Sequence, residues 1–178
     1  MNASSQVITP DHPVEDTAME FETIFDAHYV RVARVIGRIV HDPARAEELA
    51  VDVFWKLWRS STGSGENVGA WLSRAAVRAG LDELRKQARR AKYERFVGWL
   101  LEPRTPEALH IATEEQLRVR SILALLTSRD AEMLVLRSDG LTYQELAQAL
   151  GLNPASIGTL LSRAQDSFRK EYTKRYGI

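Results

Sequence analysis

A cluster of basic side chains in the middle of the chain has the chemistry to bind phosphate groups. The basic cluster consists of Arg74, Arg78, Arg85, Lys86, Arg89 and Arg90. Such cations hold a nucleic-acid backbone, and a neighbouring aromatic ring can stack on an unpaired base. Asn67 lies in a Ser- and Gly-rich loop over residues 60–69 before the cluster, and Trp71 follows that loop. We therefore predict a site for a separated nucleic-acid strand, with an ordinary solvated basic helix as the alternative.

No residue pattern for catalysis or metal binding accompanies the basic cluster. Glu47 and Glu48 are adjacent, but neighbouring residues of a helix point in different directions, so they do not form an acid–base pair. The chain has no cysteine. The histidines are isolated from one another and from clustered carboxylates; they are His12, His28, His41 and His110. Metalloprotease, phosphate-loop and nucleophile-elbow motifs are absent from the sequence. We expect no catalytic residue, no metal, no cofactor and no small-molecule substrate.

The last third of the chain carries the signals of two short helices joined by a tight turn. Thr142 and Glu145 match a capping box, and Gly151 suits the left-handed end of that helix. Asn153 can cap the next helix, which accepts Pro154 at its first position. The apolar positions shared by two crossing helices are Leu146, Ala147, Leu150, Leu152, Ile157 and Leu161. This pattern predicts a helix-turn-helix, which places a helix in the DNA major groove; the alternative is a helical hairpin that serves stability alone.

The elements that position these residues are also helical, because apolar residues recur at helical rather than alternating spacing. Helices are expected over residues 21–39, 43–58, 70–95, 114–126 and 130–137, and the last helix continues toward Tyr172. The predicted fold is all-α, with two small helical bundles joined by a linker and the helix-turn-helix in the second. The expected boundaries are a flexible tail over residues 1–18, a front domain over 19–97, a linker over 98–113 and a rear domain over 114–178.

The four tryptophans divide into two groups. Trp58 and Trp71 are in phase with the apolar faces of their helices, which predicts core positions. The pattern leaves Trp55 and Trp99 open between a core position and a base-stacking position.

The composition of the chain is that of a globular protein with unevenly distributed charge. Its 178 residues include 24 basic and 24 acidic side chains, and 44% are hydrophobic. The chain is acidic between Asp11 and Asp26 and basic between Arg74 and Arg95. Opposite charges on different faces suit a protein that contacts both a protein partner and a phosphate backbone. Because the sequence lacks a membrane-length apolar run and a signal-peptide pattern, we expect a cytoplasmic location.

The order of these segments resembles the extracytoplasmic-function (ECF) group of the sigma-70 family of bacterial transcription initiation factors. The resemblance rests on HDPARAEELAVDVFWKLW over residues 41–58, on AWLSRAAVRAGLDELRKQARR over residues 70–90, and on the helix-turn-helix. It implies that the first stretch docks on the clamp helices of the largest subunit of core RNA polymerase. The second stretch would melt and read the promoter element nearer the start site, and the helix-turn-helix would read the upstream element. The flap of the second-largest subunit and promoter DNA are further implied partners, and many relatives also have an anti-sigma factor.

The resemblance also assigns roles to individual positions. The implied polymerase-binding residues are Glu47, Glu48, Asp52 and Lys56, with Phe54 and Trp58 holding the helix in place. The implied melting residues are Asn67, Trp71 and the six members of the basic cluster, and Leu72, Asp82 and Leu84 match the same segment. The implied upstream-element residues are Thr142, Ala155, Ser156, Thr159, Ser162 and Arg163, with Ile157, Leu161 and Ala164 on the buried side.

Several positions depart from the family pattern. Relatives usually carry basic residues where Gly158 and Leu160 stand, and often arginine at Gln165, so we expect few phosphate contacts from this recognition helix. Val51 replaces a frequent glutamine in the docking helix, and Thr127 replaces a usual proline before the last bundle. Two other functions remain open at this point. One is a helix-turn-helix regulator that acts without polymerase, and the other is a protein-interaction module that never contacts DNA.

Overall fold

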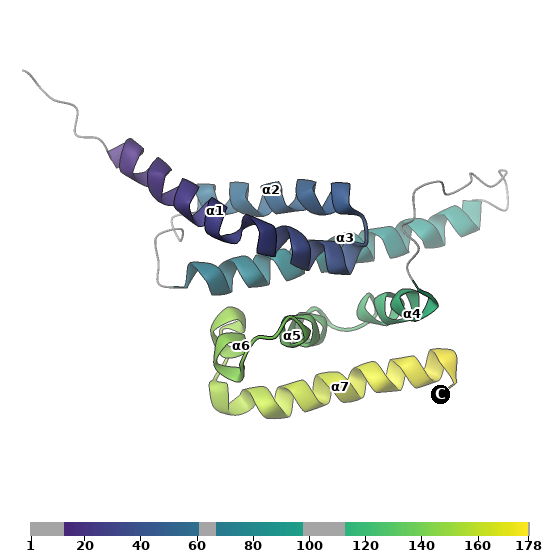
Figure 1. The fold of residues 1–178 in the computed structure, drawn as a ribbon. Coiled ribbons are helices and arrows are strands. Elements are labelled where there is room, and N and C mark those ends of the chain that lie inside the picture. Colours follow the sequence, from purple (N-terminus) through teal and green to yellow (C-terminus); the bar gives the residue numbers. More distant parts are fainter. Residues whose placement is uncertain (1–12, 61–66, 98–112, 178) are drawn as a thin grey trace, which may run out of the picture.

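Helices account for all the regular structure in the described residues, as the apolar spacing predicts. The computed structural model describes residues 13–60, 67–97 and 113–177. Seven helices and no strand occur in these ranges (Figure 1). The helices are α1 (Pro13–Val40), α2 (Pro43–Arg59), α3 (Val68–Val97), α4 (Glu114–Leu123), α5 (Ser128–Ser138), α6 (Tyr143–Leu150) and α7 (Pro154–Tyr176). The all-α prediction is confirmed.

Helices α1, α2 and α3 form a front lobe around one apolar core. Each of the three helices contacts the other two. Phe54 of α2 is 2% exposed and lies at the centre of an aromatic group. Its ring faces those of Phe21, Phe25 and Tyr29 of α1, with centroids 6.3, 4.8 and 6.2 Å away. Aromatic rings at these separations add specific edge-to-face contacts to the burial of their area, so this aromatic group fixes α2 on α1.

The connection between α1 and α2 forms as its residues predict. His41 has a φ of 57°, a left-handed conformation that ends α1 while its N–H donates to the Gly37 carbonyl at 2.8 Å. Asp42 then caps α2 by accepting a hydrogen bond from the Arg45 N–H at 3.0 Å. Pro43 occupies the first turn of α2, where its missing N–H removes no helix bond.

The helix-turn-helix also has the predicted caps. The Thr142 hydroxyl accepts from the Glu145 N–H at 3.3 Å, and the Thr142 N–H donates to the Glu145 carboxylate at 2.7 Å. These hydrogen bonds from Thr142, first from its backbone and then from its hydroxyl, lower the pKa of the Glu145 carboxyl. Gly151 ends α6 with a φ of 66°, and Asn153 caps α7. The predicted apolar seam is buried, except for Leu152, which is half-buried.

Some helix boundaries differ from those expected. Helix α1 begins at Pro13, so part of the tail expected over residues 1–18 is helical, whereas residues 1–12 lie outside the described residues. Helix α4 ends at Leu123 because the backbone N–H groups of the next turn bond back to the Ile122 carbonyl. Helix α7 continues past Tyr172 to Tyr176. Most of the expected loop and most of the expected linker, residues 61–66 and 98–112, are likewise outside the described residues.

The prediction for Trp58 is wrong, because this side chain is 41% exposed. It lies in the last turn of α2, where the ring of Phe21 contacts it edge-on at 5.0 Å between centroids. Trp71 is half-buried and packs against the core, in agreement with its helical phase. Trp55 is 58% exposed, which excludes the core alternative, and Trp99 lies outside the described residues.

Helix α3 lies between the front lobe and a rear lobe formed by α4–α7. Besides α1 and α2, it contacts α4, α5 and α6. In Figure 1, α3 runs below α1 and α2 and above α4, α5 and α6, with α7 at the bottom. The buried side chains of both lobes form one cluster. The two predicted bundles therefore pack against each other, a contact that nothing in the sequence pattern indicated.

Gly80 marks the closest approach of α3 to α1. A Cβ atom at this position would lie 2.8 Å from Cδ1 and 3.1 Å from Cβ of Ile39. We expect Gly80→Ala to lower the free energy of unfolding by about 1–2 kcal/mol, because overpacking exceeds the gain in helix propensity. Urea unfolding followed by circular dichroism measures the change. Gly37→Ala is the control, because its Cβ would make an ordinary 3.7 Å contact with Ala46, and this variant should be no less stable than the parent. Equal stability of both variants would contradict the close approach.

Candidate nucleic-acid interface

The first turns of α7 present a polar outer face and an apolar inner face. Ile157, Leu161 and Ala164 are buried against the rear lobe. The predicted upstream-element residues are all exposed; they are Thr142, Ala155, Ser156, Thr159, Ser162 and Arg163. Except for Thr142 at the start of α6, they lie on α7, and together they form the duplex face. This arrangement suits a helix that inserts its outer side into a groove of DNA.

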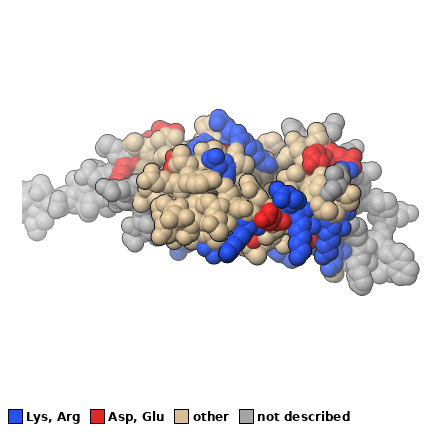
Figure 2. Space-filling model, turned by 90° about the horizontal axis from the view of Figure 1, so that it is seen from below, with Lys and Arg blue, Asp and Glu red and all other residues tan. Residues whose placement is uncertain are grey.

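The duplex face carries little positive charge. Arg163 is its only ionisable side chain. Seen from below, the side of the molecule where α6 and the start of α7 lie is mostly tan, whereas Lys and Arg gather along the later turns (Figure 2). Gly158 and Leu160 are half-buried. The geometry therefore agrees with the expectation of few phosphate contacts from this helix.

The basic cluster of α3 divides into a covered part and an exposed part. Lys86, Arg89 and Arg90 are exposed in the later turns of α3, where they can meet a phosphate backbone. Near the start of α3, Asn67 is exposed and Trp71 is half-buried. The remaining three cations of the cluster contact the rear lobe; Arg74 and Arg85 are half-buried, whereas Arg78 stays exposed.

Glu132 of α5 binds two of these three cations. Its carboxylate accepts hydrogen bonds from Nε of Arg78 at 2.9 Å and from Nε of Arg74 at 3.4 Å. The side chain of Glu132 is 5% exposed, whereas those of Arg74 and Arg78 are 32% and 52% exposed. In this arrangement a carboxylate of α5 thus contacts two of the cations that the sequence predicts to bind a nucleic acid.

Further polar contacts join the lobes on either side of Glu132. Arg85 donates to the Leu126 carbonyl at 3.4 Å. A donor of the rear lobe also bonds the front lobe: Arg120 of α4 donates to the Val40 carbonyl at 2.9 Å and to Gln87 of α3 at 3.1 Å. Burial lowers the pKa of Arg120. Four of the described helices, α1, α3, α4 and α5, thus contribute polar groups to the contact between the lobes.

The outer face of α2 carries the predicted polymerase-binding residues. All four are exposed; they are Glu47, Glu48, Asp52 and Lys56. Glu48 accepts a hydrogen bond from Arg45 at 2.6 Å, and Arg45 also bonds Glu83 of α3 at 2.9 Å. These hydrogen bonds, to Glu83 and then Glu48, raise the pKa of the Arg45 guanidinium. Arg45 thus links Glu48 to α3, whereas Asp52 makes no such ion pair within the described residues.

An apolar hollow lies beside these charges. It is lined by Phe21, Phe25, Val51, Phe54, Trp55 and Trp58. Val51 is 54% exposed, one helical turn from Trp55 on the same side of α2. The outer face of α2, which we call the docking face, thus combines the carboxylate of Asp52 with exposed apolar area. This composition is typical of a protein–protein contact rather than of a phosphate-binding surface.

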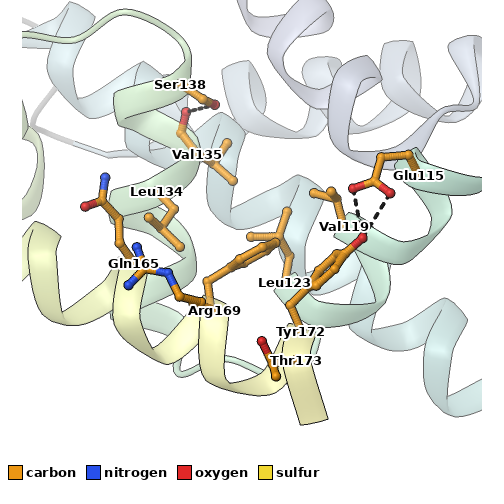
Figure 3. Close-up of a pocket in the computed structure, with 11 residues that line it drawn as sticks. Glu115, Val119, Leu123, Leu134, Val135, Ser138, Gln165, Arg169, Tyr172 and Thr173 are labelled. Carbon is orange, nitrogen blue, oxygen red and sulfur yellow. Dashed lines mark hydrogen bonds between the residues drawn. The ribbon is translucent and has the colours of Figure 1, made fainter. Parts of the chain in front are cut away.

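A second apolar groove of about 760 Å³ lies in the rear lobe. Figure 3 shows Val119 and Leu123 of α4, Leu134 and Val135 of α5, and Tyr172 of α7 around it. The Tyr172 hydroxyl donates to both oxygens of the Glu115 carboxylate, at 3.1 and 3.0 Å. This bond closes one end of the groove and leaves its apolar walls accessible.

The described residues hold neither a metal site nor a membrane span. No group of three or more His, Asp or Glu side chains in the described ranges is arranged to bind a metal ion. None of the helices in the same ranges is long and apolar enough to cross a bilayer.

The sequence pattern did not identify the residues that join the lobes. They are Glu132, Arg120 and Asp139, the last of which pairs with Arg38 of α1 at 3.1 Å. None of them belongs to a recognisable motif, because their partners lie in the other lobe. One signal was present: Glu132 stands four residues before buried Leu136, on the apolar side of α5. A charged residue in an apolar phase requires a partner, so this position pointed to an ion pair without naming the other residue.

Comparison with known proteins identifies family segments in both lobes. Residues 24–90 match Sigma-70 region 2, and residues 116–164 match Sigma-70, region 4. An ECF RNA polymerase sigma factor SigK from Mycolicibacterium vanbaalenii is 31% identical over 159 residues, which cover 85% of this chain and 80% of that protein. SigK from Mycobacterium tuberculosis is 28% identical over 156 residues, covering 84% and 82%.

A solved structure of the sigma factor RpoE in complex with the anti-sigma factor NepR from Bartonella quintana is also similar. It is 21% identical, with a TM-score of 0.48, and the match covers 90% of this chain and 98% of that chain. The identification rests on the sequence matches, which span both lobes in the order that the exposed surfaces suggested. The chain belongs to the ECF sigma factors of the sigma-70 family, non-enzymatic proteins that direct RNA polymerase to promoters.

Proposed function

We propose that this sigma factor uses three separate surfaces to bind polymerase, to hold the separated promoter strand and to read the upstream element. The exposed face of α2 binds the clamp helices of the largest polymerase subunit. The basic cluster of α3 holds the separated promoter strand, and the duplex face reads the upstream element. The observation that carries this assignment is that the three groups of predicted residues lie on separate helices, α2, α3 and α7, apart from Asn67 and Thr142, which directly precede α3 and α6.

Asp52 is the polar centre of the proposed polymerase contact. It is exposed next to Val51 and three residues before Trp55, so it can make a directed bond at the edge of an apolar patch. Such an arrangement gives orientation through the charge and affinity through the apolar area. Val51, where relatives carry glutamine, shifts this balance toward apolar contact.

Asp52→Ala is expected to weaken binding to core polymerase by about tenfold, the effect of one interface contact worth about 1.4 kcal/mol. The fold should be unchanged, because the side chain is exposed. Titration of labelled polymerase measures the dissociation constant. Asp166→Ala, which removes an exposed carboxylate of α7, is the control and should bind like the parent. Unchanged affinity of Asp52→Ala would contradict the docking assignment.

The proposed strand-binding site comprises the basic cluster, Asn67 and Trp71. Positive side chains hold the phosphates, and the half-buried indole offers one face to an unstacked base. Asn67, which is exposed four residues before Trp71, adds a polar amide to the proposed site.

The duplex face is proposed to read the upstream element through few direct contacts and through DNA shape. Arg163→Ala is expected to weaken upstream-element binding by about 1 kcal/mol, as for one base or phosphate contact. Footprint titration at a mapped promoter measures the loss, and Arg175→Ala, which removes an exposed arginine in the last turn of α7, serves as the control. If Arg163→Ala left occupancy unchanged, α7 would not be the reading helix.

The remaining partners follow from the other surfaces. We place the flap of the second-largest subunit in the rear-lobe groove, where Leu123 and Leu134 offer apolar walls. The linker over residues 98–113 would pass through the polymerase between a front domain over 19–97 and a rear domain over 114–178, with residues 1–18 as a tail. An anti-sigma factor, as in the complex of the Bartonella quintana protein, is a further proposed partner. A protein that acts on bacterial RNA polymerase is placed in the cytoplasm.

A further inference from the structure

A tyrosine in the later turns of α3 presents most of its ring to solvent. Tyr93 is 68% exposed, the highest value among the large hydrophobic side chains of the described residues. These turns of α3 extend past the ends of α1 and α2 (Figure 1). Tyr93 follows residues 24–90, the segment that matches Sigma-70 region 2, so the family match gives this residue no role.

Tyr93 shares one side of α3 with three cations of the basic cluster. Lys86, Arg89, Arg90 and Tyr93 follow the spacing i, i+3, i+4 and i+7, which places them on one side of a helix. All four side chains are exposed, and we call them the α3 stripe. The α3 stripe combines phosphate-binding cations with an aromatic ring, the two components of a surface that binds single-stranded nucleic acid.

The ring of Tyr93 is remote from that of Trp71, the aromatic residue of the strand-binding site. By the rise of an α-helix, the two residues lie about 33 Å apart along α3. Trp71 is half-buried and packs against the core, whereas Tyr93 is exposed. One base cannot contact both rings, so Tyr93 is suited to a different nucleotide of the strand.

The charge around Tyr93 favours a nucleic acid over a protein as the ligand. The stretch from Lys86 to Tyr93 contains four basic residues and no acidic residue. The docking face differs, because there the exposed ring of Trp55 lies near the carboxylate of Asp52 and lines an apolar hollow. An aromatic ring among cations alone matches a base and its flanking phosphates.

We propose that Tyr93 stacks on an unpaired base of the separated promoter strand, so that the α3 stripe forms a second base-binding position of the strand-binding site. This proposal rests on the proposed role of α3 in holding that strand. The cations of the stripe hold the phosphates on either side of the stacked base. Every base has a π face, so the contact adds affinity with little sequence preference.

The test measures binding of the full chain and its variants to a labelled oligothymidine strand that carries one 2-aminopurine base. Stacking on an aromatic ring lowers the fluorescence of 2-aminopurine, which therefore reports stacking separately from affinity. Tyr93→Ala removes the ring, Tyr93→Leu keeps its apolar bulk without a π face, and Tyr93→Phe keeps the ring without the hydroxyl. Tyr143→Ala removes an exposed tyrosine whose ring lies beneath Arg137, and it is the matched control. Replacement of the three cations of the α3 stripe with alanine measures the contribution of the charges.

Tyr93→Ala and Tyr93→Leu should weaken strand binding about tenfold, the effect of one lost base–aromatic stack. Both variants should also raise the fluorescence of the bound 2-aminopurine strand. Because neither removes a charge, the slope of log affinity against log salt should equal that of the parent, whereas the cation variant should lower this slope. Tyr93→Phe and Tyr143→Ala should bind like the parent.

Parental affinity and fluorescence in Tyr93→Ala and Tyr93→Leu would overturn the proposal. If the cation variant then still bound more weakly, the strand-binding site on α3 would stand without Tyr93; if it bound like the parent, the proposed role of α3 would fail as well. An equal loss of affinity in Tyr93→Phe would replace stacking by a hydrogen bond from the hydroxyl. Weaker binding to core polymerase with unchanged strand binding would assign the ring to a protein contact. If Tyr93→Ala does not fold, as judged by circular dichroism, the comparison of Tyr93→Leu with Tyr93→Phe decides the outcome.

Discussion

Replacing Lys86, Arg89 and Arg90 together with alanine is expected to reduce open promoter complexes about a hundredfold. Each side chain is exposed in the later turns of α3. Three phosphate contacts at about 1 kcal/mol each give about 3 kcal/mol, or two orders of magnitude. The salt dependence should fall as well, by about two units in the slope of log affinity against log salt for a single strand. Permanganate footprinting of melted thymines with core polymerase measures the complexes.

The matched control for this triple variant removes the same charge elsewhere. Lys170, Lys174 and Arg175 are exposed near the end of α7, outside all three proposed surfaces. Their replacement with alanine should leave melting within a few-fold of the parent. If the two triple variants lost melting equally, net charge rather than the position on α3 would explain the effect. Full melting by the α3 variant would show that these cations do not hold the strand.

Phe54→Ala is expected to lower the free energy of unfolding by about 3–5 kcal/mol. The ring is 2% exposed and contacts three aromatic rings of α1, so its removal leaves a large cavity between α1 and α2. The free energy of unfolding of a single domain is about 5–15 kcal/mol in total, so this substitution removes a large part of the stability of the front lobe. Polymerase binding should fall with it, because α2 is held on α1 by this aromatic group. Urea unfolding followed by circular dichroism measures the stability.

Trp55→Ala provides the comparison for Phe54→Ala on the adjacent residue. Trp55 is 58% exposed on the outer side of α2, so its removal should change the free energy of unfolding by less than about 1 kcal/mol. A similar loss from both variants would contradict the assignment of Phe54 to the core. Trp55→Ala also tests the apolar part of the docking face, and this variant should weaken polymerase binding.

Local signals were sufficient to predict most helix ends. Thr142, Glu145, Gly151 and Asn153 act within a few residues of their own positions, so their caps follow from spacing alone. Trp58 shows the limit of this reasoning. Its helical phase was correct, but exposure depends on what covers the end of a helix, and there the edge-on ring of Phe21 leaves Trp58 41% exposed.

The surfaces that follow from a single helix were also predictable. The outer side of α7 carries the expected residues because burial of Ile157 and Leu161 fixes its orientation. The state of Arg74 and Arg78 was not predictable, because their partner Glu132 is more than fifty residues away in the chain and in another lobe. Contacts between lobes follow from tertiary packing, which no local pattern encodes.

Transcription reconstituted from purified components tests the central claim most directly. Core RNA polymerase, the full chain and a library of host genomic fragments should together yield transcripts with discrete start sites, which neither protein produces alone. Asp52→Ala should reduce their number, and the α3 triple variant should nearly abolish them. The contrary result is a library without any such start site, combined with a duplex footprint from the chain in the absence of polymerase.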